Sequence, residues 1–268
     1  MAQRLFTMLM LGILLTTTRG YAQDPNFYIY LCFGQSNMEG NARIQEQDKT
    51  VDERFQVLES MDCPGLGRVK GHWYPAVPPL CRCSTGLSPA DFFGRTMVAT
   101  LPKHIRVGVV NVSVAGCKIE LFDKDHFQAY ADTAPSWMKG IIKQYDGNPY
   151  AALVAMGKRA QQDGVIKGIL LHQGESNPND SAWTQKVKSI YTNLISDLHL
   201  TSDSIPLLAG ECVSADQQGA CAAMNAIIAT LPDVLPQAHV ISSKGCAARP
   251  DHLHFTTEGY TLLGQRYG

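Results

Sequence analysis

The chain lacks any excess of charge of one sign. Its 268 residues contain 23 Lys and Arg against 24 Asp and Glu, which gives a formal net charge of −1. Nucleic-acid-binding proteins and proteins recruited to anionic membranes usually carry a basic excess, so neither kind of partner is expected. The remaining composition, 45% hydrophobic and 18% charged, is that of an ordinary globular protein.

Long apolar runs are also missing, because no segment after residue 22 is long and apolar enough to span a bilayer. The first 22 residues instead have the pattern of a signal peptide. Arg4 supplies a positive charge, residues 5–15 form a short apolar run, and Gly20 and Ala22 are small residues beside a plausible cut before Gln23. We therefore expect a secreted or periplasmic protein that has no membrane association after cleavage.

The chain has no Pro- or Ser-rich linker, no block of like charges and no internal repeat. This absence predicts one domain over residues 23–268, a length of about 245 residues that suits a single α/β domain. The sequence ends at Gly268, soon after the last predicted helix begins near Thr257, which leaves open whether C-terminal sequence is missing.

None of the eight cysteines is arranged as a zinc site. Cys81-x-Cys83 is not a zinc spacing, and no second Cys/His pair completes a ligand set, so we expect no metal and no organic cofactor. Export permits disulfides, and Cys63, Cys81 and Cys83 lie in a Pro- and Gly-rich stretch that a disulfide would stabilise. Spacing does not give the pairing. Cys32, inside an apolar run, is expected to be a small buried hydrophobe.

Short apolar runs alternate with helical patterns along the chain. The predicted strands are residues 27–33, 106–114, 165–171, 206–209 and 239–242, and the predicted helices are residues 88–101, 148–163, 180–198, 221–231 and a segment from about 257. Residues 41–87 show no regular pattern. Strands separated by helices predict βαβ crossovers, so we expect an α/β three-layer sandwich with a central parallel sheet of about five strands.

Three of these strands end in segments rich in glycine and small polar residues, at positions 34–37, 115–117 and 172–177. Catalytic and ligand-binding residues of α/β proteins lie at the carboxyl ends of the parallel strands, so the three segments are expected to share one crevice. Ser36 lies on the turn after the first strand, where a helix start near Asn37 would direct unpaired N–H groups at whatever the serine attacks. This position suits a nucleophile, although Ser-Asn at a helix start is also an ordinary N-cap.

A serine nucleophile needs a base, and the best candidate lies near the other end of the chain. Asp251 and His254 are three residues apart and would project to the same side of one helical turn. The carboxylate would accept the imidazole Nδ1–H and leave Nε2 facing the serine. His252 is the competing base but would point away, and no further ligands accompany the pair as a metal site would require.

The motifs occur in a fixed order along the chain: Gly-Gln-Ser-Asn-Met at 34–38, Val-Ser-Val-Ala-Gly at 112–116, His-Gln-Gly-Glu-Ser-Asn at 172–177, and Asp-x-x-His at 251–254. Together they resemble the SGNH hydrolase superfamily and, within it, carbohydrate esterase family 6, which includes acetylxylan esterases and is related to sialate O-acetylesterases. The first motif is not the G-x-S-x-G elbow of α/β-hydrolases, because Met38 occupies the position of the second glycine. Cys117 and Asn177 depart from the commoner residues of the pattern, but neither removes a required group.

The resemblance implies the flavodoxin-like SGNH hydrolase fold, with Ser36 as nucleophile and His254 as base. The oxyanion donors it implies are the N–H groups of Ser36 and Gly116 and the side-chain amide of Gln173.

The acid partner of the base is left between two carboxylates. Asp251 is favoured by its spacing from the histidine, and Glu175 has that role in some relatives. Neighbouring motif residues are expected to contact the substrate, namely Gln35, Asn37 and His172.

The implied activity is that of a secreted carbohydrate O-acetyl esterase acting on acetylxylan through an acyl-enzyme, with O-acetyl sialic acid as the alternative substrate. A non-catalytic sugar-binding module of the same fold, with Trp73, Tyr74 and Trp137 stacking on sugars, would not need both Ser36 and the Asp-His pair. A lipid or thioester hydrolase would need a long apolar groove, whereas residues 41–87 are mixed polar and aromatic. The sequence does not indicate an oligomeric state.

Overall fold

The middle layer of the structure is a seven-stranded sheet in the order β3-β2-β4-β1-β5-β6-β7. All neighbouring strands are parallel except β3, which pairs with β2 in the antiparallel sense. The computed structural model describes residues 23–268, and the predicted signal peptide lies outside them. The strands are β1 (Asp24–Gly34), β2 (Phe55–Leu58), β3 (Trp73–Pro75), β4 (Arg106–Ser113), β5 (Gly164–His172), β6 (Leu207–Gly210) and β7 (Ala238–Ile241).

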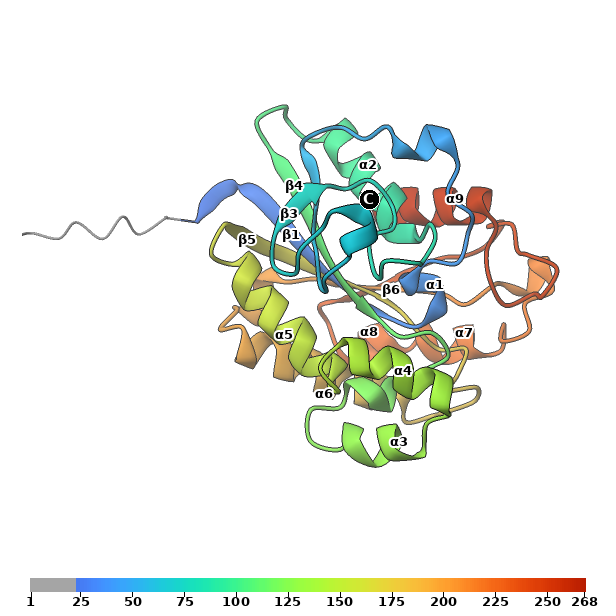
Figure 1. Ribbon diagram of the computed structural model, residues 1–268. Coiled ribbons are helices and arrows are strands. Elements are labelled where there is room, and N and C mark those ends of the chain that lie inside the picture. Colours follow the sequence, from blue (N-terminus) through green and yellow to red (C-terminus); the bar gives the residue numbers. More distant parts are fainter. Residues whose placement is uncertain (1–22) are drawn as a thin grey trace, which may run out of the picture.

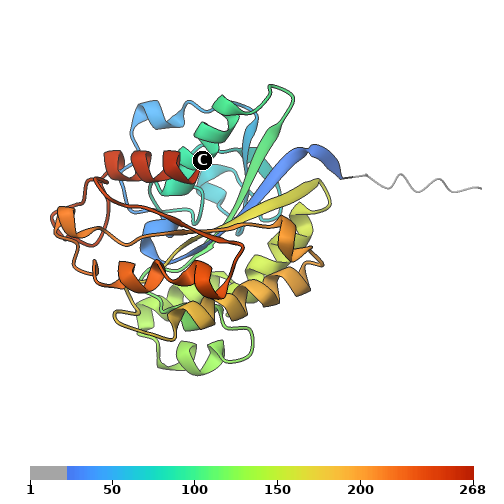
Figure 2. The same ribbon diagram turned by 180° about the vertical axis from the view of Figure 1, so that it is seen from behind.

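Helices cover both faces of this sheet, as Figures 1 and 2 show from opposite sides. Two of them, α2 and α9, pack on one face, and most of the others lie on the opposite face. The helices are α1 (Ser36–Glu39), α2 (Pro89–Thr100), α3 (Phe127–Thr133), α4 (Ser136–Gln144), α5 (Pro149–Ala160), α6 (Trp183–Asp197), α7 (Met224–Ile228), α8 (Leu231–Val234) and α9 (Thr257–Tyr267). The predicted three-layer α/β sandwich is confirmed.

The central strand β1 explains why its sequence is a continuous apolar run. Ile29, Leu31 and Phe33 enter the core beneath α5 and α6, whereas Tyr30 and Cys32 enter the core beneath α2 and α9. Each fully buried large apolar side chain contributes roughly 1.5–3 kcal/mol relative to exposure. Cys32 is fully buried, as predicted.

The predicted helix starts at residues 88 and 148 are confirmed. The Ser88 N–H donates to Asp91 Oδ2 at 2.8 Å at the start of α2. At the start of α5, the Ala151 N–H donates to Asn148 Oδ1 at 3.0 Å. Such caps satisfy N–H groups that have no intrahelical acceptor and typically contribute about 1 kcal/mol each.

Two predictions about the elements were wrong. The sheet has seven strands rather than about five, because β2 and β3 lie within residues 41–87. The predicted helix at 221–231 is two short helices, α7 and α8. Pro232 has no N–H to donate to Ile228, so a continuous helix is interrupted there.

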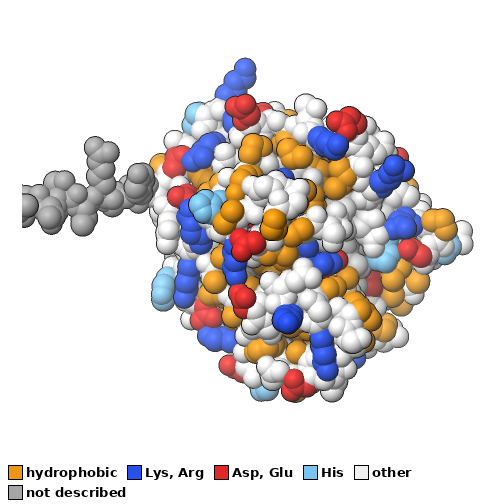
Figure 3. Space-filling model, viewed as in Figure 1, with side chains coloured by type: hydrophobic (Ala, Val, Ile, Leu, Met, Phe, Trp, Pro, Cys, Tyr) orange, Lys and Arg blue, Asp and Glu red, His pale blue; other side chains and the backbone are white. Residues whose placement is uncertain are grey.

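The surface carries charges of both signs. Figure 3 shows acidic and basic side chains interspersed with apolar ones on the face that it presents. In the part of the chain that the structure describes, no helix is both long enough and apolar enough to cross a membrane.

Candidate active site

The carboxyl ends of β4, β1 and β5 meet at one edge of the sheet. Gly34, at the end of β1, pairs with Ser113 on one side and His172 on the other. A side chain at Gly34 would lie 2.1 Å from the His172 carbonyl oxygen, so glycine is needed where these strands approach. The three polar segments therefore adjoin one another, as predicted, and the Ser176 hydroxyl donates to the Gly116 carbonyl at 2.9 Å.

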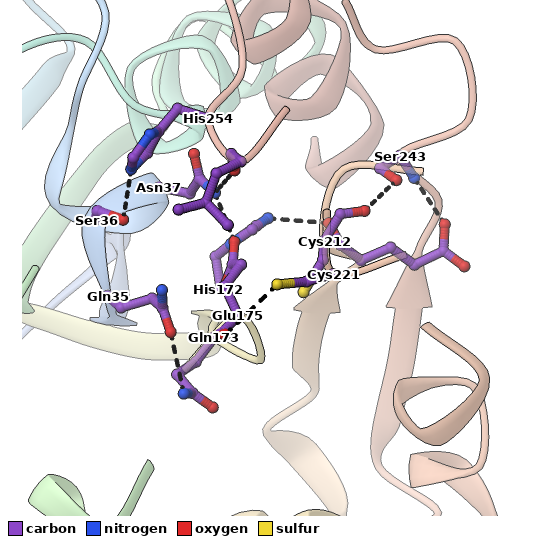
Figure 4. A network of polar contacts seen from close by, with 12 residues as sticks. Gln35, Ser36, Asn37, His172, Gln173, Glu175, Cys212, Cys221, Ser243 and His254 are labelled. Carbon is purple, nitrogen blue, oxygen red and sulfur yellow. Dashed lines mark hydrogen bonds and ion pairs between the residues drawn. The ribbon is translucent and has the colours of Figure 1, made fainter. Parts of the chain in front are cut away.

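Three side chains form a hydrogen-bonded chain at this edge. Ser36 is the first residue of α1, and its Oγ lies 2.9 Å from His254 Nε2 (Figure 4). His254 Nδ1 lies 2.9 Å from Asp251 Oδ2. With Nδ1 protonated toward the carboxylate, Nε2 presents its lone pair to the serine hydroxyl, which is the arrangement needed for general-base activation.

Asp251 is held rigidly in this arrangement. Its other oxygen, Oδ1, accepts the backbone N–H groups of Leu253 and His254, both at 2.9 Å. Partial burial acts to raise the pKa of Asp251, but the His254 N–H, the imidazole and the Leu253 N–H outweigh it and lower that pKa to about 2. The carboxylate therefore remains ionised at neutral pH. His252 turns away, with Nδ1 3.3 Å from the Gln217 carbonyl oxygen.

The lowered pKa of Asp251 predicts a pH dependence of stability. A carboxyl whose folded pKa lies below its ordinary value of 3.8 stabilises the fold above that value, and the contribution is lost as pH falls toward about 2. We expect the urea midpoint of the wild type to fall more steeply over this range than that of Asp251→Asn. The effect is modest because 42% of the side chain is exposed. Parallel midpoint curves for the two proteins would contradict the assignment.

Two backbone N–H groups are available as oxyanion donors. Ser36 begins α1, so its N–H has no intrahelical acceptor. Gly116 lies on the turn after β4 with a left-handed φ of 67°, and its N–H makes no hydrogen bond within residues 23–268. The ring of Trp137 packs over this turn and would lie 2.8 Å from a Cβ at position 116, and the left-handed φ favours glycine there.

Gln173, the third predicted donor, is engaged with protein groups. Its Nε2 lies 2.7 Å from Asn177 Oδ1 and 3.1 Å from Gln35 Oε1, while its Oε1 accepts the Trp183 indole N–H at 2.5 Å. The side chain is buried. To join an oxyanion hole, the amide would have to exchange one of these bonds, so its role there stays a prediction.

The assignment of Gln35, Asn37 and His172 to substrate contact stays a prediction, because in this structure their side chains are engaged with protein groups. All three are buried. Gln35 Oε1 accepts the Ser176 N–H at 3.2 Å, and His172 Nε2 lies 3.0 Å from the Glu211 carbonyl oxygen.

Glu175, the alternative acid partner, is also turned away from the histidine. Its Oε1 accepts the Asn37 amide at 2.5 Å (Figure 4), whereas His254 Nδ1 is hydrogen-bonded to Asp251. Of the two carboxylates left open by the sequence, Asp251 has the geometry of the acid partner.

A buried ion pair at the site was not predicted from the sequence. Glu39, at the end of α1, accepts Arg82 Nε at 2.8 Å and the Ala115 N–H at 3.1 Å on the same oxygen. Arg82 precedes Cys83, which forms a disulfide with Cys63. Through Glu39, α1 is therefore joined both to the Arg82 loop and to the turn after β4. The only signal in the sequence was an acidic residue directly after the Gly-Gln-Ser-Asn-Met motif.

A hollow of about 690 Å³ is lined by residues that flank the triad along the chain, although Ser36, Asp251 and His254 are not among its lining residues. Its walls include Glu39 and Arg82, and also Arg43, Arg249 and Thr256. Arg249 belongs to the same loop as His254, and the Arg249 N–H donates to the His254 carbonyl at 2.8 Å. The hollow offers positive as well as negative groups.

Comparisons with known proteins bear on the family and the fold of the chain. A sequence model of the family described as "Carbohydrate esterase, sialic acid-specific acetylesterase" matches residues 26–268. Among solved structures, a protein from Arabidopsis thaliana is similar at 20% identity with a TM-score of 0.67, over 90% of this chain and 95% of that one. The structure of NanS is similar at 14% identity with a TM-score of 0.60, over 91% and 96% of the two chains.

A third similar structure is a carbohydrate acetylesterase from Xanthomonas citri, at 15% identity with a TM-score of 0.58. The similarity covers 88% of this chain but only 54% of that protein. At these identities the solved structures establish a shared fold.

Proposed function

Because the chain belongs to the family of carbohydrate esterases and sialic acid-specific acetylesterases, we propose that it removes acetyl groups from acetylated polysaccharide, acetylxylan in the first place, by a serine acyl-enzyme mechanism. The observation that carries the proposal is the chain of two 2.9 Å contacts from Ser36 through His254 to Asp251. A non-catalytic sugar-binding module has no need of this arrangement.

In the proposed reaction, His254 Nε2 takes the proton from Ser36 Oγ as that oxygen attacks the acetyl carbonyl carbon. The negative charge on the carbonyl oxygen is stabilised by the Ser36 and Gly116 N–H groups. His254 then gives its proton to the sugar oxygen as its bond to the acetyl carbon breaks, so the sugar leaves as an alcohol and acetyl-Ser36 remains. His254 next takes a proton from a water molecule, whose oxygen attacks the acetyl carbon, and it returns this proton to Ser36 Oγ as the ester bond breaks and acetate is released. Asp251 stabilises the imidazolium at both stages.

An exposed tryptophan beside the oxyanion turn supports a polymeric sugar substrate. The Trp137 side chain, on α4, is 54% exposed although its ring packs against Gly116. An aromatic face beside the reacting carbonyl can stack on a sugar ring. In this proposal Trp137 holds a sugar residue of the acetylated chain next to Ser36.

A second candidate is hydrolysis of O-acetyl sialic acid, and the hollow lined by residues that flank the triad favours it. Arg43 and Arg249 line that hollow, and a guanidinium is well suited to bind the carboxylate of an acidic sugar. Arg249 is tied to the Asn41 carbonyl at 3.2 Å, so the group is held in place.

The two candidates are separated by measuring acetate release from acetylated xylan and from O-acetyl sialic acid at equal acetyl concentration. We expect faster release from xylan, and Trp137→Ala should lower kcat/KM on xylan by roughly fivefold because a stacked ring contributes on the order of 1 kcal/mol. On p-nitrophenyl acetate, which has no sugar, the same variant should match the wild type within about twofold. Faster release from sialic acid, lost in Arg249→Ala, would replace the first candidate by the second.

We also propose that the protein works outside the cytoplasm. The signal-like pattern of residues 1–22 and the Cys63–Cys83 disulfide both support export, since disulfides persist mainly in oxidising compartments.

A further inference from the structure

A buried amide joins three parts of the chain directly beneath the triad. Asn37 follows the nucleophile, and its Nδ2 donates to Glu175 Oε1 at 2.5 Å and to the Leu253 carbonyl at 3.1 Å. The Tyr260 hydroxyl donates to Asn37 Oδ1 at 2.7 Å. Burial raises the pKa of Tyr260, so this hydroxyl remains a donor. Asn37 is fully buried, and its amide is therefore fixed in one orientation.

The residue that immediately precedes the catalytic base is held on both sides. Asp251 Oδ1 accepts the Leu253 N–H at 2.9 Å, and Asn37 Nδ2 donates to the Leu253 carbonyl. His254 lies in a loop between β7 and α9, outside any helix or strand. The position of its imidazole therefore depends on these contacts rather than on regular secondary structure.

Glu175 fixes the direction of the Asn37 amide. Its side chain is only 2% exposed, and Oε2 has no hydrogen-bond partner among the described residues. The nearest group able to carry positive charge is His172, whose Nδ1 lies 3.6 Å from Oε1. His172 directs Nε2 to the Glu211 carbonyl, so Nδ1 faces the carboxyl (Figure 4). This separation is longer than a hydrogen bond, and His172 Nδ1, like Glu175 Oε2, has no hydrogen-bond partner among the described residues.

We propose that Glu175 is a positioning residue, which acts through Asn37 to hold the Leu253 peptide and so sets the His254 imidazole against Ser36. The proposal rests on the proposed esterase function and assigns the fourth residue of the His-Gln-Gly-Glu motif a task other than that of acid partner. Glutamine keeps the contact with Asn37, because its oxygen can replace Oε1 as the acceptor. Alanine does not.

The test is steady-state hydrolysis of p-nitrophenyl acetate by Glu175→Gln, Glu175→Ala, Asn37→Ala and the Ala/Ala double variant. Glu175→Gln should keep kcat within about fivefold of the wild type. Each alanine variant should lower kcat by roughly 10- to 100-fold with KM within about twofold, since small misplacements of reacting groups have effects of this size. The double variant should be no slower than the slower single variant, because both residues act through one contact.

Two further variants guard against effects of folding alone. Tyr260→Phe keeps the ring and removes the hydroxyl that holds Asn37, so it should fold and lower kcat in the same direction by a smaller factor. Asp91→Asn alters another buried carboxyl, at the start of α2 and outside this network, and should leave kcat within about twofold. Wild-type kcat in Tyr260→Phe and in both alanine variants would overturn the proposal.

Other outcomes also decide the matter. If Glu175→Gln were as slow as Asp251→Asn, Glu175 would be a catalytic carboxylate and the positioning role would be wrong. If the losses of Glu175→Ala and Asn37→Ala multiplied in the double variant, the two residues would act independently. An active Ser36→Ala enzyme would refute the esterase mechanism itself, whereas an inactive one with fully active Glu175→Ala would refute only the positioning role.

Discussion

Ser36→Ala is expected to lower kcat for p-nitrophenyl acetate by roughly 10⁴- to 10⁶-fold, the range seen when a triad nucleophile is removed. The loss is this large because the acyl-enzyme route needs a covalent bond to Oγ, and water must then attack the ester directly. Oxyanion stabilisation and binding would supply the residual rate. The fold should be retained, because alanine is smaller than serine and the substitution removes only the hydrogen bond between Ser36 Oγ and His254 Nε2.

Ser60→Ala is a matched control for this variant. Ser60 is another buried serine, and its hydroxyl donates to the Cys81 carbonyl at 3.2 Å. We expect its kcat to equal that of the wild type within about twofold. An enzyme that hydrolyses the ester at the wild-type rate without the Ser36 hydroxyl would be incompatible with the proposed mechanism.

Asp251→Asn is expected to lower kcat by roughly 10³- to 10⁴-fold while the geometry of the site persists. The asparagine oxygen can still accept the N–H groups of Leu253 and His254, but its NH₂ faces His254 Nδ1. That contact favours the tautomer with the proton on Nε2, and this nitrogen then cannot accept the serine proton. The measurement is kcat across pH 5–9, and folding is checked by the thermal midpoint at neutral pH.

The same variant decides between the two carboxylates near the histidine. If Glu175 were the acid partner, Asp251→Asn would have nearly the kcat of the wild type, and Glu175→Gln would show the large loss of kcat. The observed contacts predict the opposite order, since Glu175 Oε1 is bonded to Asn37 and Asp251 Oδ2 to His254.

The sequence predicted the parts of the fold whose cause is local. The start of α2 could be predicted because Ser88, Pro89 and Asp91 form a complete helix cap within four residues. The alternation along β1 and the convergence of three strand ends follow from the rules of parallel sheets. The Asp251–His254 contact was predicted from spacing alone, because both partners lie in one turn of chain.

Elements that depend on distant contacts were missed. The strands β2 and β3 have four and three residues, too few for a clear pattern, and they form by pairing with a sheet edge. Glu39 and Arg82 are brought together by a loop that the Cys63–Cys83 disulfide closes. Spacing did not reveal that pairing.

The surroundings of the residues assigned to substrate contact were also not predicted. Motif position places Gln35, Asn37 and His172 near the serine but does not give the direction of their side chains. The structure turns all three into the protein, where their hydrogen bonds have protein partners. The side chains that face outward at the site, Trp137 and the arginines of the hollow, lie outside the motifs.

The most direct test of the central claim is covalent capture of the nucleophile. The enzyme is incubated with a small organophosphate, such as a dialkyl fluorophosphate, and the modified peptide is identified by mass spectrometry. A nucleophile activated by His254 predicts complete loss of activity with one adduct on Ser36, and strongly slowed labelling in His254→Ala. Continued ester hydrolysis with Ser36 unmodified, or an adduct at another residue that accounts for the inactivation, would contradict the claim.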